Sequence, residues 1–402
     1  MRIGALQLYL GPQEREWCTP SALGDLLRHV FSGFAVPRLL VWNCLGPAWL
    51  DAVHSACSNS GVDLHAWYPV LADRLDGECP EDALVESPWG HRGRGTQGFW
   101  SGMDGGEERF RFRSPRNALS DERFVSSLEI LLDSGAYCGV FLDRIRFPSP
   151  ANGIEMLFAS CRDPDPSEAG GILRRLRETE RESDGISSWE EFYRILDLEN
   201  VFRERSDWIG RATETLADPV RSRGLQLGAD LYSPSIAPLV GQDYSRFASI
   251  CDWIKPMTYF RACGPAGLPL EIGSFLDGLC GLGGWKRESA LGLVRRITGL
   301  GVEDRPTNGL PGTASVSGRG REVEAALRVG KAAGCRICPG IEAVRHPRFK
   351  PAVDAAMLGA SLEELRGLAE EIVPSWNVLY IPEDNLKTVA DFAAPGADDG
   401  NR

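Results

Sequence analysis

The sequence predicts an α/β fold, a (β/α)₈ TIM barrel with long insertions after strands 3 and 4. Short apolar runs rich in Val, Ile, Leu and aromatic residues alternate with longer amphipathic stretches, a pattern typical of βα units around a parallel sheet. Eight such runs occur, which is the number of strands that a TIM barrel needs. They lie at residues 2–10, 38–45, 62–70, 139–147, 225–232, 253–259, 335–343 and 376–381.

The segments between these runs predict the outer helices of the barrel. Their apolar residues recur three and four positions apart, as in helices that pack one face against a sheet. Thr19-Pro20 and Gly46 are start signals for two of them, and Ser120 caps a third. The predicted helices cover residues 21–31, 47–57, 120–132, 189–216, 242–250, 288–297, 321–333 and 361–372.

The chain has 402 residues, whereas a TIM barrel typically needs about 250. Most of the surplus falls at 72–117 and 151–223, after the third and fourth strands, and loops in these places build the face that carries active sites. The Gly-, Ser- and Thr-rich residues 298–320 predict a mobile connection. We therefore expect one domain over 1–392, followed by a disordered tail at 393–402.

Composition excludes several classes of partner. The 44 Lys and Arg residues against 56 Asp and Glu give a net charge of −12, which disfavours nucleic acid and anionic lipid and favours a neutral or cationic substrate. No apolar stretch approaches the roughly 18 to 20 residues of a membrane span. The first residues read as a strand, not as an export signal, so we expect a cytoplasmic protein.

The cysteines indicate reduced thiols. There are 11, an odd number in a long chain with a large core, which agrees with a cytoplasmic location better than with a disulfide framework. Cys335 and Cys338 have the spacing of metal ligands, but no second pair or nearby His completes a site. We expect no metal and no cofactor.

Polar residues stand at the ends of five predicted strands. Because a parallel strand buried on both faces should be apolar, such residues either serve a site or are neutralised by a partner. Since the carboxyl ends of the strands form one rim, we expect them to converge there. They are His65 and Trp67 on the third strand, Asp143 and Arg146 on the fourth, Asp230 and Tyr232 on the fifth, Tyr259 on the sixth and Glu342 on the seventh.

The motifs at these strand ends resemble those of a known group. GVFLDRIRFPSP, which contains Asp143, is similar to the DxxRFP motif on the fourth strand of bacterial glycosyl-hydrolase-like TIM-barrel domains. VDLHAWYPVL, ADLYSPSIAPLVGQDYSRFASICDWIKPMTYF and CPGIEAV resemble the third, fifth to sixth and seventh strands of that group. The PMTY ending is also similar to family 18 chitinases, but the DxxDxDxE run of those enzymes is absent. The resemblance implies a glycoside hydrolase acting on an oligo- or polysaccharide.

Glycoside hydrolysis uses two carboxyl groups on either side of the scissile bond. We assign Asp143 as nucleophile or charge stabiliser, with Arg146 holding it ionised, Asp230 as its partner and Glu342 as the candidate acid/base.

Further residues are candidates for binding the substrate. His65 and Tyr259 are expected to hydrogen-bond sugar hydroxyls, and Arg146 and Tyr232 to line the site. Trp67, with Trp100 or Trp89, is expected to stack on sugar rings.

Two alternatives stay open at this stage. The barrel could be catalytically inactive and bind a glycan or a protein partner, with Asp143, Arg146 and Asp230 forming a structural ion-pair cluster. It could also be an enzyme of other chemistry that uses the same Asp and Arg rim. The sequence does not predict the sugar, the linkage or the oligomeric state.

Overall fold

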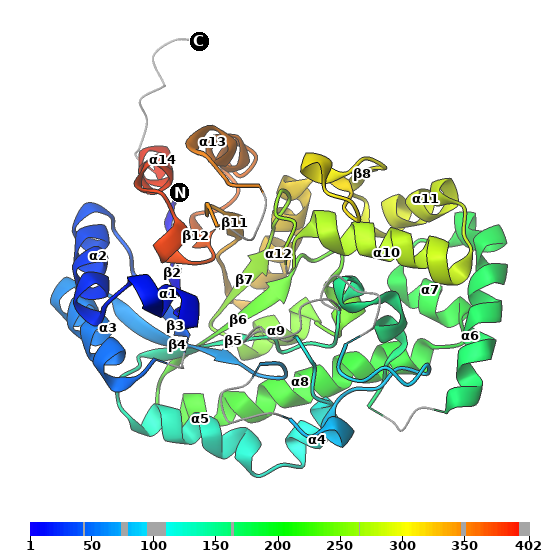
Figure 1. The fold of residues 1–402 in the computed structure, drawn as a ribbon, viewed down its shortest axis with the longest axis horizontal. Coiled ribbons are helices and arrows are strands. Elements are labelled where there is room, and N and C mark those ends of the chain that lie inside the picture. The colour runs from blue at the N-terminus through cyan, green and yellow to red at the C-terminus, as the bar shows by residue number, and fades with distance from the viewer. Residues whose placement is uncertain are drawn as a thin grey trace.

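The computed structural model describes residues 1–42, 45–73, 79–94, 110–161, 165–264, 266–346 and 351–393. A parallel sheet curves through the centre of the molecule, and helices surround it (Figure 1). Its strands are β1 (Arg2–Ile3), β2 (Leu6–Leu8), β3 (Arg38–Trp42), β4 (Asp63–Pro69), β5 (Gly139–Asp143), β6 (Gln226–Tyr232), β7 (Trp253–Met257), β10 (Arg336–Ile337), β11 (Gly340–Glu342) and β12 (Glu371–Ser375).

The order of the strands is β1-β12-β11-β7-β6-β5-β4-β3-β2, and every pair in the series is parallel. Strands β1 and β2 belong to one short segment, residues 2–8, of which β1 pairs with β12 and β2 with β3. This segment therefore contacts both ends of the series and brings the sheet round into a barrel. The predicted TIM-barrel fold is confirmed.

Large and small side chains alternate inside the barrel. The Phe141 and Trp253 rings stack with centroids 4.9 Å apart, and the indole lies over Gly228, where a β-carbon would come within 2.3 Å of it. Gly139 leaves the same kind of space for the imidazole of His65. The two glycines thus let bulky rings from neighbouring strands fill the interior, as barrel packing requires.

The predicted helices of the first six barrel units are present. They are α2 (Pro20–Gly33), α3 (Pro47–Ser60), α5 (Arg123–Asp133), α8 (Glu199–Ser222), α9 (Tyr244–Ile250), α11 (Arg287–Thr298) and α12 (Arg319–Ala333). The sequence prediction missed α10 (Leu268–Gly283), in which apolar residues and glycines do not form a clear amphipathic stripe.

The prediction for the last βα unit is wrong by several residues. The final barrel strand is β12 (Glu371–Ser375), not residues 376–381, which contain the 3₁₀ turn Val378–Tyr380. The preceding helix is α13 (Ala355–Glu363), not residues 361–372. Glu371 makes this strand hard to recognise, since a charge at a buried position is uncommon, but Arg2 neutralises it at 2.7 Å. Helix α14 (Glu383–Ala393) then ends the described chain.

The segment 151–223 folds as an ordered set of helices. It contains α6 (Pro166–Thr179), α7 (Trp189–Ile195) and α8, and α8 contacts α5, α9 and β6 as a helix of the barrel itself does. The single helix predicted at 189–216 is thus two helices. Figure 1 places α6 and α7 beside α10 and α11, on the opposite side of the sheet from α2 and α3. The true insertion is therefore the part before α8.

Two other segments were predicted to be a connection and an insertion without regular structure of their own. Residues 298–320, predicted to be a mobile connection, contain an antiparallel hairpin of β8 (Gly301–Glu303) and β9 (Ser315–Ser317). The first insertion, 72–117, is described only in part and ends in α4 (Pro115–Leu119). Of the predicted tail, residues 394–402 lie outside the described residues. Within the described ranges, none of the helices has both the length and the apolarity needed to cross a membrane.

Candidate active site

Asp143 is the last residue of β5, at the carboxyl end of the barrel, and lies opposite Pro69 of β4. The indole Nε1 of Trp67 donates a hydrogen bond to Asp143 Oδ2 at 3.0 Å. The backbone N–H of Arg144 donates to Oδ1 at 2.6 Å. The side chain of Asp143 is 13% exposed. Both oxygens of Asp143 are therefore acceptors held in place by the third and fourth barrel strands.

Arg144, not Arg146, is the cation that faces Asp143. Its Nε lies 3.8 Å from Asp143 Oδ2, and its guanidinium also pairs with Asp73. The reason is a turn: Arg144 has φ of +54°, which ends the regular alternation of the strand. The guanidinium then lies over the ring of Trp42 at 4.8 Å. The prediction that Arg146 is the partner of Asp143 is corrected accordingly.

Arg146 and Tyr232 belong to a second, fully buried cluster. The Arg146 guanidinium lies between the rings of Phe112 and Tyr232, 4.3 and 4.7 Å from their centroids. The Tyr232 hydroxyl donates to Glu271 Oε1 at 2.9 Å. Burial raises the pKa of Glu271, although the charge of Arg146 opposes the shift. These two predicted binding residues thus pack around a carboxyl group that the sequence analysis did not single out.

Asp230 is the immediate neighbour of Asp143 across the sheet. The pairing of β5 with β6 runs to Leu142 opposite Ala229, so Asp143 and Asp230 occupy the next position on adjacent strands. Neighbouring strands lie about 4.8 Å apart, and residues at matching positions point to the same face. The predicted convergence of these two carboxyl groups is therefore present in the fold.

The environment of Asp230 differs from that of Asp143. Its side chain is 4% exposed, and Oδ2 accepts a hydrogen bond from Lys255 Nζ at 2.9 Å. Oδ1 has no hydrogen-bond partner among the described residues. Burial raises the pKa of Asp230 to about 7; Lys255 opposes this shift and the nearby Asp143 adds to it. Asp230 is thus a carboxyl group that can hold a proton near neutral pH.

Lys255 and Tyr259 complete this buried cluster. Burial opposes the charge on Lys255, but the carboxylate of Asp230 and the hydroxyl of Tyr259 outweigh it and raise the pKa of the lysine. Burial likewise raises the pKa of Tyr259 to about 12, against the effect of Lys255. The lysine therefore stays an ammonium group that pairs with Asp230 from the matching position of the neighbouring strand.

Glu342 lies at the end of the seventh barrel strand, but donors occupy both of its oxygens. The backbone N–H groups of Arg261 and Ala262 donate to Oε1 at 2.5 and 3.1 Å. The buried guanidinium of Arg319 donates to Oε2 at 3.1 Å. Because three donors occupy the two oxygens of Glu342, this geometry favours a structural role over the predicted acid/base role.

His65 does not lie at the rim. It pairs with Gly139, the first residue of β5, and so lies four positions before Pro69, or about 13 Å along the strand. Burial lowers the pKa of His65 to about 3, and the charges of Arg38 and Arg336 act in the same direction. The neutral imidazole fills the lower barrel interior, so it cannot contact a substrate bound at the rim.

The predicted aromatic platform is only partly described. Trp67 is in place, with its ring 5.1 Å from that of Trp42 and edge-on to it. Trp89 lies in the first insertion and packs against Phe158, 5.7 Å away. Trp100 lies outside the described residues.

Sequence reasoning missed the roles of Arg144, which directly follows β5, and of Lys255, which is the middle residue of β7. It also missed Asp73 and Glu271. Asp73 lies four residues after the end of β4, in the loop where an active-site residue could be sought, whereas Glu271 lies on the unpredicted helix α10. Among the described residues, no three His, Cys, Asp or Glu side chains are placed to hold a metal ion.

Comparison with solved structures finds proteins that align with nearly the whole chain. The catalytic domain of a beta-amylase from Paenibacillus polymyxa aligns with a TM-score of 0.51 and 8% identity, over 98% of this chain and 99% of that one. A chitinase from Chromobacterium violaceum aligns over 98% and 100% of the two chains, with a TM-score of 0.44 and 9% identity. No model of a protein family matches the sequence, and comparison with curated proteins finds no match.

The chain therefore shares the barrel fold of the beta-amylase domain. At 8% identity the likeness extends to the fold alone and assigns no catalytic residue.

Proposed function

We propose that this chain is a glycoside hydrolase acting on an oligo- or polysaccharide, with Asp143 and Asp230 as its carboxyl pair. One observation carries the proposal: two carboxyl groups stand side by side at the carboxyl rim of a barrel, one partly exposed and held by hydrogen-bond donors, the other buried against a lysine. Unequal carboxyl groups of this kind divide into acid and base or nucleophile. The shared fold of the beta-amylase domain agrees with this function.

Asp143 is proposed as the nucleophile or charge stabiliser. It is the more exposed of the two, and Trp67 and the Arg144 amide fix both of its oxygens as acceptors. Such fixed donors keep the carboxyl group oriented while positive charge develops on the sugar ring. Trp67 and Tyr259 are proposed to contact the sugar near this group, with Arg144 in place of Arg146.

Asp230 is proposed as the group that supplies the proton to the leaving oxygen. Its raised pKa, about 7, leaves part of the population protonated at neutral pH, and Oδ1 is the oxygen free to carry the proton. The short spacing of adjacent strands fits the closer carboxyl separation of retaining enzymes, about 5 to 5.5 Å. The net charge of −12 favours a neutral or cationic carbohydrate.

The test compares purified wild-type protein with Asp143→Asn and Asp230→Asn on a panel of neutral and amino-sugar oligosaccharides. Both variants are expected to lose at least about a hundredfold in kcat, since each removes a group that acts in the transition state. Asp252→Asn is the matched control, because Asp252 sits at the opposite end of the same strands, where it accepts a hydrogen bond from Leu227 N. Full turnover by folded Asp143→Asn protein contradicts the proposal.

A barrel that binds glycan without cleaving it is the second candidate, and the Lys255–Asp230 ion pair favours it. A buried ion pair is a common structural element, and Asp230 is nearly closed off from solvent. On this alternative the wild-type protein binds oligosaccharides but turns none of them over. Asp143→Asn then changes affinity alone.

A further inference from the structure

A cavity of about 530 Å³ is lined by the loop after β7, the β8–β9 hairpin, the start of α12 and helix α13. We name it the α13 pocket. Its apolar surface comes from Phe260, Pro306, Val316 and Met357, and its charged residues are Arg261, Arg305, Arg319 and Glu364. The volume is in the range of small-molecule sites, about 300 to 1,000 Å³. The pocket therefore combines apolar walls with a small number of charged groups, as ligand sites do.

Arg319 has a nitrogen without a hydrogen-bond partner, although its side chain is fully buried. Its Nη2 donates to Glu342 Oε2 at 3.1 Å, and its Nε donates to the carbonyl of Thr258 at 3.4 Å. Nη1 forms no hydrogen bond with a described residue, and Glu364 Oε1 lies 3.6 Å from it, too far for one. Because a buried donor without an acceptor is costly, Nη1 is a group that a ligand in this pocket would satisfy.

Arg261 brings a second guanidinium group to the same side of the pocket. Its backbone N–H and the Nη2 of Arg319 bind the two oxygens of one carboxylate, that of Glu342, so the two arginines are neighbours. Arg261 Nε donates to Ser361 Oγ at 3.4 Å. Ser361 and Glu364 are one turn apart at the end of α13, so both guanidinium groups approach the same face of that helix.

Glu364 supplies the opposite charge beside these arginines. Its side chain is 44% exposed, and its carboxylate accepts no hydrogen bond from a described residue. The other charges of the pocket already have partners, since Arg305 Nε lies 2.8 Å from Glu303 Oε2 and Glu342 balances Arg319. Arg261 forms no ion pair with a described residue. The pocket thus presents guanidinium donors and an incompletely bound carboxylate side by side.

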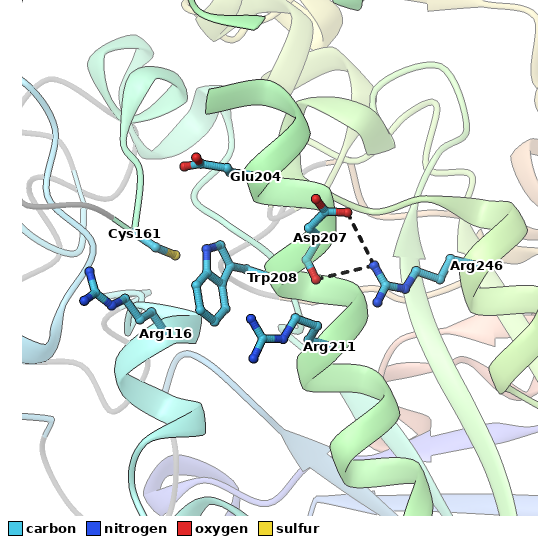
Figure 2. A pocket seen from close by; sticks show the side chains of 7 residues that line it. All are labelled: Arg116, Cys161, Glu204, Asp207, Trp208, Arg211 and Arg246. Atoms are coloured by element: carbon cyan, nitrogen blue, oxygen red, sulfur yellow. Dashed lines mark hydrogen bonds and ion pairs between the residues drawn. The ribbon is translucent and has the colours of Figure 1, made fainter. Parts of the chain in front are cut away.

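Figure 2 shows another hollow, of about 450 Å³, in which the charged groups are arranged differently. The Arg211 guanidinium stacks over the ring of Trp208 at 4.4 Å, and Arg116 lies on the other side of that indole. Arg246 already donates to Glu214 at 2.9 Å. Because the indole separates Arg116 from Arg211, these groups do not converge on one ligand.

We propose that the α13 pocket binds a small zwitterion, an α-amino acid with an apolar side chain. Its carboxylate would accept hydrogen bonds from Arg319 Nη1 and from the Arg261 guanidinium, and its ammonium group would donate to Glu364. A single carbon atom separates the two charged groups of an α-amino acid, which suits a donor and a carboxylate that lie 3.6 Å apart. The apolar side chain would pack on Phe260 and Met357.

The charge balance favours a zwitterion over a simple anion. Glu364 would repel an anion bound at the arginines, whereas the ammonium group of an amino acid neutralises it. The proposal does not depend on the hydrolase function, because none of the carboxyl groups proposed for catalysis lines this pocket.

Calorimetric titration of the full chain tests the proposal, with leucine, isocaproate and isoamylamine as separate probes. The three share one apolar chain, but isocaproate lacks the ammonium group and isoamylamine lacks the carboxylate. Leucine is expected to bind once per chain, at least about tenfold more tightly than either of the others. Equal binding of leucine and isocaproate, or no measurable binding of leucine at about 10 mM, overturns the proposal.

Variants assign the binding to this pocket. Glu364→Gln is expected to weaken leucine binding by about tenfold without weakening that of isocaproate, since only leucine carries the ammonium group. Arg261→Ala keeps the backbone N–H that holds Glu342 and is expected to weaken both ligands by about tenfold. Glu363→Gln is the matched control, because this exposed neighbour pairs with Arg366 at 2.6 Å and does not line the pocket.

The control is expected to bind leucine as the wild type does. Equal weakening by Glu363→Gln and Glu364→Gln overturns the proposal. Loss of leucine binding in Asp143→Asn together with normal binding in Glu364→Gln would place the ligand at the barrel rim and overturns it as well.

Discussion

Lys255 and Asp230 form a buried ion pair inside the barrel, with Nζ 2.9 Å from Oδ2, and Asp230 occupies the strand position that matches Asp143 on the neighbouring strand. Isolated charges are costly at such depth, so each group depends on the other. Because Lys255 occupies only one oxygen, the second oxygen of Asp230 is left for a proton. The pair therefore connects the packing of the barrel to the protonation state of the proposed active site.

Replacing Lys255 by Met should destabilise the protein by about 3 to 5 kcal/mol, because it leaves Asp230 buried without its partner. Urea unfolding at pH 7 measures this change. The Lys255→Met/Asp230→Asn double variant should lose less than the sum of the two single changes, since the second substitution removes the unpaired charge. Strictly additive losses would show that the two side chains do not interact.

The pH profile of turnover provides a separate prediction. If Asp230 donates a proton, kcat/KM should fall as pH rises through about 7, the raised pKa of Asp230. Lys255 lowers the pKa of Asp230. The fraction of Lys255→Met protein that folds should therefore keep its activity to a higher pH than the wild type. If kcat/KM of this variant falls at the same alkaline pH as that of the wild type, Asp230 is not the proton donor.

The indole of Trp67 should matter through its N–H group more than through its ring. Trp67→Phe keeps an aromatic ring against Trp42 but removes the donor to Asp143, and it should lower kcat by about 10- to 100-fold. Trp253→Phe is the matched control, because the Trp253 N–H has no acceptor among the described residues. Equal losses of turnover in both variants would point to packing as the cause.

The barrel could be predicted from the sequence because its parallel strands are buried on both faces and read as apolar runs. The eighth strand could not, since β12 contains Glu371 and Pro374, which a propensity argument places outside a strand. Its acid is neutralised by Arg2, a residue from the other end of the chain. Such long-range pairing leaves no local signal.

The site was predictable to the same degree. Asp143 and Asp230 stand at the ends of two strands that follow one another in the predicted barrel. The predicted strand order is therefore enough to place them side by side. Whether Arg144 or Arg146 faces Asp143 depends on the positive φ angle of Arg144. A positive φ angle is uncommon in a residue other than glycine, so the sequence does not predict it. The ion pair between Glu342 and Arg319 depends on how α12 packs against the barrel. The spacing of apolar residues in the sequence does not predict that packing.

His65 should make the protein sensitive to acid. Its pKa is lowered to about 3 in the folded state, against about 6.5 in an unfolded chain, so the unfolded state binds more protons between these values. The stability from this group is complete above about pH 6.5 and falls by about 1.4 kcal/mol per pH unit below it. Unfolding free energies of His65→Gln should fall less steeply over this range, while those of His54→Gln, an exposed histidine on α3, should follow the wild type.

Gly228 should tolerate no side chain. A β-carbon there would lie 2.3 Å from Cε2 of Trp253, whose ring is fixed in turn by stacking on Phe141, so Gly228→Ala should cost at least about 1 to 3 kcal/mol in unfolding free energy. Gly33→Ala, in a helix with nothing within 4 Å of the new atom, is the matched control and should be neutral or slightly stabilising. Trp253→Leu should recover part of the loss in the Gly228→Ala background, because it removes the ring that the methyl group meets. Unchanged stability of Gly228→Ala would mean that the ring can shift and that the barrel interior is loosely packed at this level.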